Sequence, residues 1–212
     1  MNSLAVVYPL LATVAAYLVG SLSFAVIVSR AMGLNDPRTY GSKNPGATNV
    51  LRSGSKAAAI VTLLLDAFKG WLPVVLVKWF GEPYGLAEGT VAMVGLAAFL
   101  GHLFPVFFRF VGGKGVATAL GVLLAISGWL GLATGAVWVL AALVWRYSSL
   151  SSLLAALLAP VLYLLGGGMT WVMDRNIVVA IAAMSALLIW RHAENIGRLV
   201  KGTESKLGAK KA

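Results

Sequence analysis

The sequence predicts an all-α, polytopic membrane protein with seven transmembrane helices. Of its 212 residues, 59% are hydrophobic and only 11% are charged, and the mean hydropathy is +0.88. Soluble globular domains carry a much larger charged fraction. Because one transmembrane helix needs about 20 apolar residues, seven of them leave no room for a separate soluble domain. We therefore expect residues 1–212 to form a single transmembrane domain.

Apolar runs between polar breaks define the predicted spans. No Lys or Arg precedes the first run, so it lacks the charged start of a cleaved signal peptide. The fourth and sixth runs are short, and hydropathy leaves open whether both cross fully or are re-entrant. The spans are expected at residues 4–28, 57–80, 89–109, 115–127, 129–146, 150–166 and 176–191.

Lysine and arginine set the predicted orientation, because cytoplasmic loops carry the positive excess. Of the 17 basic residues, all but Arg175, Lys69 and Lys78 fall on one side. Lys69 and Lys78 lie inside the second span, the latter close enough to its end to snorkel. The amino terminus is therefore expected outside, with residues 192–212 as a basic cytoplasmic tail. The net charge of +10 favours anionic lipid headgroups over nucleic acid, for which no binding module is present.

Two scarce residue types exclude several chemistries. The chain contains no cysteine, which removes disulfides, thiolate metal sites and a thioester-forming nucleophile. The two histidines, His102 and His192, lie far apart in sequence, so a histidine-rich metal site is not expected. We therefore expect no metal and no cofactor.

The string FVGGKGVAT, which leads into the fourth span, has the features of a phosphate site. Consecutive glycines let backbone N–H groups point into one concavity, and a helix N-terminus adds free donors and a positive end. The candidates are Gly112, Gly113 and Gly115 with Lys114. A tight turn between antiparallel helices would explain the same glycines. A nucleotide P-loop is not indicated, because glycine rather than Ser or Thr follows the lysine.

The first inner stretch, GSKNPGATNVLR at residues 41–52, is unusually polar for a membrane protein. Ordinary turn chemistry explains any one of its residues. Two cations and four uncharged hydrogen-bonding side chains at one membrane face instead predict a polar ligand with anionic groups. Arg52 offers a planar fork suited to phosphate. The other candidates for substrate contact are Ser42, Asn44, Thr48 and Asn49.

Two further polar stretches fall on the same face. In WRYSSLSS, most serines are expected to cap the sixth span, and Ser149 is the candidate for ligand contact. In RHAENIGRLVKGTE, His192 and Asn195 lie one helical turn apart if the last helix continues. A single interfacial histidine is often structural, so this spacing alone leaves the role of His192 open.

Ionisable groups inside a span are functional candidates by default. Asp66 and Lys69 stand three residues apart and can pair on one helix face, so a pair that neutralises itself is the simpler interpretation. His102, inside the third span, needs a buried partner or a cavity. We expect it to be a structural hydrogen-bonding group.

Together, these segments resemble the motifs of a known family. GSKNPGATNVLR, GHLFPVFFRFVGGKGVATALG and RHAENIGRLVKGTE are similar, in that order, to three signature motifs of the bacterial acyl-phosphate-dependent glycerol-3-phosphate acyltransferases. The similarity extends over nearly the whole chain. It implies a seven-helix protein of the bacterial inner membrane with a cytoplasmic active site. The implied reaction moves a fatty acyl group from acyl phosphate to the sn-1 hydroxyl of glycerol 3-phosphate, giving lysophosphatidic acid and phosphate.

The resemblance also implies roles for particular residues. Substrate binding and catalysis would fall to Ser42 and Arg52 in the first motif, Lys114 and its neighbouring glycines in the second, and His192 and Asn195 in the third. The histidine would position or deprotonate the attacking hydroxyl. Alternatively, the donor's own phosphate takes the proton, since a phosphate has a second pKa of about 6.

Two details concern the donor and the fit to the family. Lys43 stands where glycine is expected in many relatives. Acyltransferases that use CoA or carrier-protein thioesters typically show His followed five residues on by Asp, whereas Phe107 and Gly197 stand at that distance from the two histidines. The donor is therefore expected to be acyl phosphate. Expected partners are the two substrates, membrane lipid and the enzyme that supplies acyl phosphate.

A transporter of a small phosphorylated solute is the main alternative. Transporters commonly show a repeated half and polar groups along a midplane path. This sequence has no internal repeat, an odd number of predicted spans and polar groups gathered on one face. A structural, lipid-organising protein would leave the glycine-rich anion site unexplained.

Overall fold

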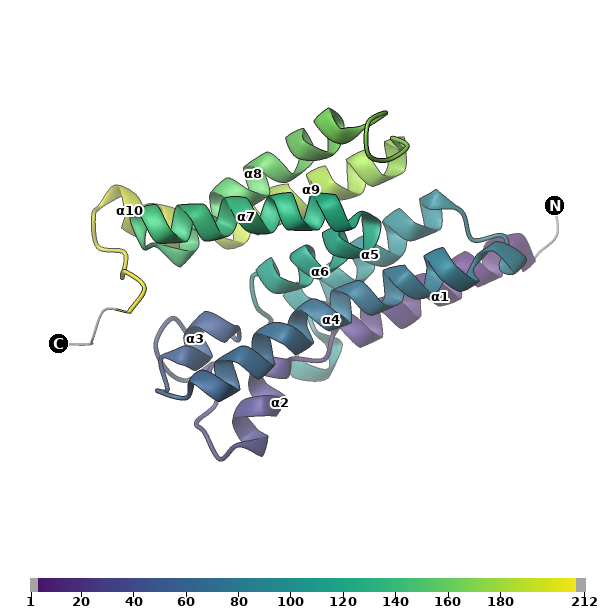
Figure 1. Ribbon diagram of the computed structural model, residues 1–212. Coiled ribbons are helices and arrows are strands. Elements are labelled where there is room, and N and C mark those ends of the chain that lie inside the picture. The colour runs from purple at the N-terminus through teal and green to yellow at the C-terminus, as the bar shows by residue number, and fades with distance from the viewer. Residues whose placement is uncertain (1–3, 209–212) are drawn as a thin grey trace.

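The computed structural model describes residues 4–208, and over that range the fold is helical apart from one isolated β-bridge (Figure 1). The all-α prediction is therefore confirmed. The helices are Leu4–Gly20 (α1), Phe24–Ala31 (α2), Ala47–Leu51 (α3), Lys56–Phe80 (α4), Glu88–Leu103 (α5), Val116–Ile126 (α6), Gly128–Trp145 (α7), Ser148–Gly166 (α8), Arg175–Arg191 (α9) and Ala193–Val200 (α10), with short 3₁₀ turns at Glu82–Tyr84 (η1) and Val106–Phe108 (η2).

Four helical segments are long and apolar enough to cross a membrane: α4, α5 continued through η2, α7 and α8. Two bent pairs qualify as broken spans, α1 with α2 at 42° and α9 with α10 at 57°. α6 has 11 residues, about 16 Å of helix against a hydrocarbon core of about 30 Å. The described residues thus hold four to six candidate spans, and the seven-span arrangement stays a prediction.

Two boundaries differ from the sequence prediction. The first predicted span, 4–28, is interrupted at residues 21–23. Just before the interruption, Gly20 packs so closely on α5 that an added Cβ would lie 2.1 Å from the Ala98 carbonyl oxygen. The predicted tail from residue 192 begins as helix α10 after a sharp bend. Its last four residues, 209–212, lie outside the described part of the chain.

α6 lies at the centre of the bundle, packed against α4, α5 and α7. Glycines permit a very close approach to α4. A Cβ added to Gly70 in α4 would lie 2.3 Å from the Thr118 carbonyl oxygen, and a Cβ added to Gly121 in α6 would lie 1.9 Å from the Ala67 carbonyl oxygen. α6 therefore begins beside the middle of α4 rather than beside its start. The glycine-rich loop that precedes α6 consequently lies deep between the helices.

Lys78 has a more specific role than the predicted snorkelling. Its ammonium donates to the carbonyl oxygens of Ala125 and Ile126, at 3.1 and 2.7 Å. These are the last two residues of α6, whose carbonyls have no partner within their own helix. A cation at this negative helix end is also electrostatically favourable. Lys78 therefore stabilises the end of this short helix.

Two lobes extend from the bundle at the end opposite the amino terminus (Figure 1). The first lobe comprises α2, α3 and the start of α4, around a small apolar core of Ala25, Val28, Val50, Ala58 and Ala59. The second lobe comprises α10 and the adjoining ends of α7 and α8. After α10, residues 201–208 form an extended tail that stays in contact with the second lobe, where the Leu207 N–H donates to the Arg146 carbonyl at 2.6 Å.

Candidate active site

Four polar stretches from distant parts of the sequence meet at the end that carries both lobes. The hydroxyl oxygens of Thr48 in α3 and Ser148 in α8 lie 3.3 Å apart. Lys114 of the glycine-rich loop donates a hydrogen bond to Asn195 Oδ1 in α10. In the tail, Ser205 Oγ accepts from Arg52 Nη2 at 3.0 Å. These contacts bring together the segments that the sequence places on one face.

The glycines of GGKG have no room for side chains. An added Cβ on Gly112 would lie 2.3 Å from two carbonyl oxygens, and one on Gly113 would lie 2.2 Å from His102 Nε2. Gly115 has φ +84°, and its added Cβ would lie 2.3 Å from the Phe99 ring. The tight-turn and ligand-site interpretations both need these glycines, so the choice rests on the free donors that the loop presents.

The loop presents unpaired backbone donors at the start of α6. The Gly113 N–H donates to the His102 carbonyl at 3.1 Å and is not available to a ligand. Arg191 donates to the carbonyl oxygens of Gly112 and Gly113 at 2.9 and 3.2 Å. The N–H groups of residues 114–118 have no hydrogen-bond acceptor among residues 4–208. A helix N-terminus with free N–H groups and a neighbouring lysine is suited to bind phosphate.

The surroundings of Lys114 disfavour its charged form and lower its pKa. Burial, followed by the nearby positive charge of Arg198, lowers the pKa of Lys114 to about 8, while Glu204 and Glu194 act in the opposite direction. The ammonium is still charged at neutral pH. A phosphate bound beside it would stabilise that charge further.

His192 lies in the bend between α9 and α10 and is 3% exposed. Its Nδ1 lies 2.8 Å from the Leu188 carbonyl oxygen. A carbonyl only accepts, so Nδ1 carries the proton and Nε2 is left as an acceptor. Burial is the main cause that lowers the pKa of His192 to about 4, and the positive charge of Lys114 lowers it as well. The hydrogen bond to Leu188 acts in the opposite direction. The imidazole is therefore neutral at physiological pH, in the tautomer that a base requires.

Within the first stretch, the predicted contact residues divide into two kinds. Asn49 is buried, and its amide donates to the carbonyls of Pro37 and Tyr40 at 2.7 and 3.2 Å. Its Oδ1 accepts from the Ser42 N–H at 3.1 Å and from Arg52 at 3.3 Å. Asn49 therefore holds the loop rather than offering free groups to a ligand.

The remaining residues of this stretch keep polar groups accessible. Ser42 and Thr48 are exposed and Asn44 is half-buried, and the Ser42 hydroxyl has no hydrogen-bond partner within residues 4–208. Lys43 adopts φ +54°, a left-handed conformation that favours glycine. The left-handed backbone at position 43 therefore explains why the resemblance leads us to expect glycine there.

Glu204 in the tail belongs to the candidate site and was not predicted from the sequence. Its carboxylate accepts from Ser149 Oγ and Asn195 Nδ2, both at 2.7 Å, and from Arg198 Nε at 2.6 Å. Burial raises the pKa of Glu204, but these three hydrogen bonds outweigh it and the pKa is lowered overall. The predicted ligand residue Ser149 is thus paired with the tail. The glutamate ends the string RHAENIGRLVKGTE, which was the available sequence signal.

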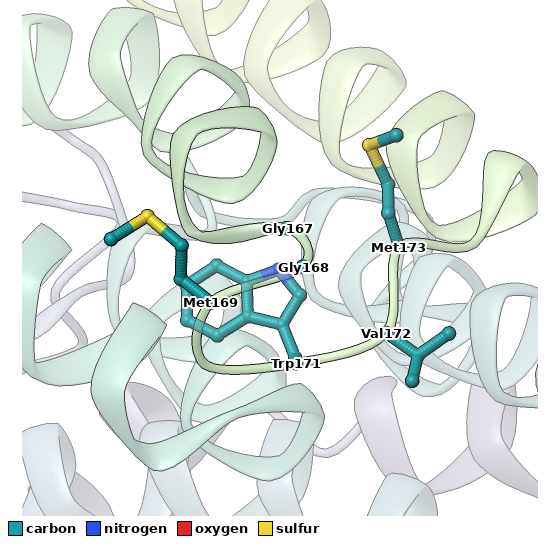
Figure 2. Close-up of a pocket in the computed structure, with 6 residues that line it drawn as sticks. All are labelled: Gly167, Gly168, Met169, Trp171, Val172 and Met173. Carbon is teal, nitrogen blue, oxygen red and sulfur yellow. The ribbon is translucent and has the colours of Figure 1, made fainter.

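The two best-defined cavities lie away from these residues. One, of about 540 Å³, is formed by the loop between α8 and α9, where Met169, Val172 and Met173 project in different directions (Figure 2). The other, of about 490 Å³, lies beside the first stretch and is lined partly by Arg30 and Arg38. Within residues 4–208, no cluster of His, Asp and Glu is suited to hold a metal ion.

Comparisons with known proteins agree on one family. The family model described as glycerol-3-phosphate acyltransferase matches residues 10–202. A glycerol-3-phosphate acyltransferase of Albidiferax ferrireducens is 68% identical over 99% of this chain and 94% of its own length. That of Burkholderia pseudomallei is 61% identical over 95% and 97%. The chain belongs to the glycerol-3-phosphate acyltransferase family.

The solved structures of this family also match the fold. PlsY, described as an integral membrane glycerol 3-phosphate acyltransferase, matches in its glycerol 3-phosphate form with a TM-score of 0.86 and 38% identity, over 95% of this chain and 96% of PlsY. Its lysophosphatidic acid form matches with a TM-score of 0.85 and 37% identity. This member of the family is therefore a multi-pass membrane acyltransferase, and its three motif strings lie where the two lobes meet.

Proposed function

We propose that this acyltransferase moves a fatty acyl group from acyl phosphate to the sn-1 hydroxyl of glycerol 3-phosphate, giving lysophosphatidic acid and phosphate. The observation that carries the proposal is the unpaired N–H groups of residues 114–118 beside Lys114 and Asn195. The glycerol 3-phosphate and lysophosphatidic acid forms of the similar PlsY structures support the acceptor and the product. The lack of cysteine favours direct transfer without an acyl-enzyme.

Two phosphates then have to be bound near one another. We assign the phosphate of the donor to the start of α6, where free N–H groups and the positive helix end stabilise charge that develops on the transferring group. We assign the phosphate of the acceptor to Arg52 and Ser42. Asn44 and Thr48, on the same stretch, are candidates for its hydroxyls. Bidentate contact by a guanidinium suits a phosphate monoester.

The transfer step requires a proton acceptor. The acceptor hydroxyl attacks the acyl carbonyl carbon, the bond from that carbon to the phosphate oxygen breaks, and phosphate leaves. The hydroxyl proton goes either to His192 Nε2 or to the donor phosphate, whose second pKa of about 6 suits it to the task. A dianionic substrate beside His192 would raise its pKa from the low value of the free protein.

The chain is proposed to act in the bacterial inner membrane with the site at the cytoplasmic face. The amino terminus is outside, and seven segments cross, including the short α6. Phosphorylated acceptor and donor are then both reached from the cytoplasm, and the enzyme that supplies acyl phosphate is the expected protein partner.

A donor comparison tests the proposed reaction. Purified protein is incubated with glycerol 3-phosphate and either palmitoyl phosphate or palmitoyl-CoA, and lysophosphatidic acid and released phosphate are measured. We expect equal amounts of both products with palmitoyl phosphate and neither with the thioester. Transfer from palmitoyl-CoA at a comparable rate would contradict the assigned donor.

A further inference from the structure

A buried polar network lies beneath the glycine-rich loop, separate from the groups assigned to transfer. Asp66 and Lys69 are each 2% exposed and form an ion pair at 2.8 Å. This confirms the pairing predicted from their spacing. Lys69 also donates to the Leu22 carbonyl at 2.7 Å, in the break between α1 and α2. The pair therefore joins α4 to a segment whose backbone carbonyl has lost its helical partner.

His102 connects this pair to the loop. Its Nδ1 lies 3.6 Å from Asp66 Oδ1 and 3.2 Å from Thr118 Oγ1. The opposite edge of the ring faces Gly113, where an added Cβ would lie 2.2 Å from His102 Nε2. The His102 carbonyl also accepts the Gly113 N–H. The imidazole is thus held on one side by the network and packs against the loop on the other.

Gly113 is confined from its other sides as well. An added Cβ would lie 2.8 Å from the Pro45 carbonyl oxygen of the first stretch, and Arg191 donates to the Gly113 carbonyl. A change in the position of the His102 ring must therefore move the loop or strain these contacts. Lys114 follows directly, so such a shift would reach the proposed phosphate site.

We propose that Asp66, Lys69 and His102 are positioning residues that hold the glycine-rich loop in place for the phosphate of the acyl donor. The inference rests on the proposed function for the identity of that donor. An ion pair removed from water in the bundle is costly, and apolar residues of similar volume often serve packing equally well. Packing alone does not explain why the buried network is retained, whereas its contact with Gly113 does.

The test compares two losses of a lysine from the same helix. Asp66→Asn/Lys69→Met removes the buried pair without leaving one unpaired charge, whereas Lys78→Met removes a lysine that caps the far end of α6. Since a displacement of about 1 Å can cost up to 100-fold, we expect the double variant to lose about tenfold in kcat/KM for acyl phosphate. Its KM for glycerol 3-phosphate should stay within twofold. Lys78→Met should lower the Tm without changing either parameter.

A second measurement reports the loop directly and needs no substrate. The chain has no cysteine, so a single Val111→Cys, at a side chain that is 52% exposed, can carry a nitroxide label. We expect greater label mobility with the double variant and no change with Lys78→Met. If the double variant does not fold, His102→Gln, which removes the ring but keeps a polar group, should give the same two effects.

The outcomes separate this inference from the proposed function. If the double variant shows unchanged kinetics for acyl phosphate and unchanged label mobility but a lower Tm, the inference is overturned. The network would then have a structural role only. Failure of the unmodified protein to use acyl phosphate would overturn the proposed function instead. In that case the label would still report whether the network holds the loop.

Discussion

At neutral pH, His192 is an uncharged imidazole whose Nε2 is left as an acceptor, because Nδ1 donates to Leu188. If it acts as the base, His192→Ala and His192→Asn should both lower kcat by about 100-fold or more. Asn can still position a hydroxyl but cannot accept its proton. Steady-state rates with saturating substrates give the comparison. Near-normal turnover of the Asn variant would assign proton transfer to the donor phosphate.

The lowered pKa of Lys114, about 8, predicts how activity depends on pH. If Lys114 binds the donor phosphate as proposed, it must be protonated to do so, and kcat/KM for acyl phosphate should fall as pH rises through about 8. In Lys114→Arg this decline should move to higher pH, because a guanidinium stays charged. His192, with a pKa of about 4, should add no titration between pH 5 and 7. A decline that stays at the same pH in Lys114→Arg would show that another group causes it.

The left-handed backbone of Lys43 predicts a stabilising substitution. Lys43→Gly should raise the free energy of unfolding by about 1 kcal/mol, because glycine adopts positive φ without the cost of a Cβ. Lys43→Ala is the matched control, since it removes the charge but keeps the strained backbone. Thermal unfolding in detergent distinguishes the two. Equal effects of Gly and Ala would mean that charge, not conformation, matters here.

Glu204 shows what residue patterns alone leave out. The strings predicted that Lys114, His192 and Asn195 share one site, because each lies in a compact motif at a predicted span end, and Lys114 does contact Asn195. Glu204 reaches Ser149 and Asn195 only because the tail folds back after α10. No periodicity predicts such a return. Glu204→Gln removes the charge that Arg198 pairs with, at a cost of about 2 kcal/mol, and is expected to lower both the Tm and kcat.

At the scale of elements, the close packing of α6 on α4 depends on glycine. Gly121→Ala should destabilise the protein by about 1–3 kcal/mol, because the new methyl group would overlap the Ala67 carbonyl. Gly128→Ala at the start of α7, where an added Cβ meets nothing within 4 Å, is the control and should leave the Tm unchanged. Equal melting temperatures for the two variants would contradict the packing described for α6.

The sequence predicted that long apolar helices form, but it did not predict where they are interrupted or bent. The apolar run through residues 4–28 gives no breaker strong enough to place the gap at 21–23, which depends on the tertiary contacts of Gly20 and on Lys69. The bend at residue 192 likewise arises where α9 passes into the strongly amphipathic α10. The interruption at 21–23 lies beside these contacts between helices, on which local hydropathy carries no information.

At the scale of the whole molecule, the proposed orientation is based on the distribution of Lys and Arg and is open to direct measurement. Val172, between α8 and α9, is 91% exposed, and Lys201, after α10, is also exposed. Single cysteines at these two positions lie at opposite ends of the bent pair α9 and α10. In intact cells, a membrane-impermeant maleimide should label Val172→Cys and not Lys201→Cys. Labelling of Lys201→Cys alone would show that the orientation is the opposite of the one proposed.

In the proposed mechanism both phosphates bind where the two lobes meet, and a substitution of Lys114 tests this placement most directly. Lys114→Ala should nearly abolish formation of lysophosphatidic acid from acyl phosphate and glycerol 3-phosphate, while expression in the membrane and the Tm are retained. Lys206→Ala, which removes a nearby cation that contacts only the Tyr147 ring among the interactions found in residues 4–208, should keep its activity. Full activity of Lys114→Ala with saturating substrates would contradict the account.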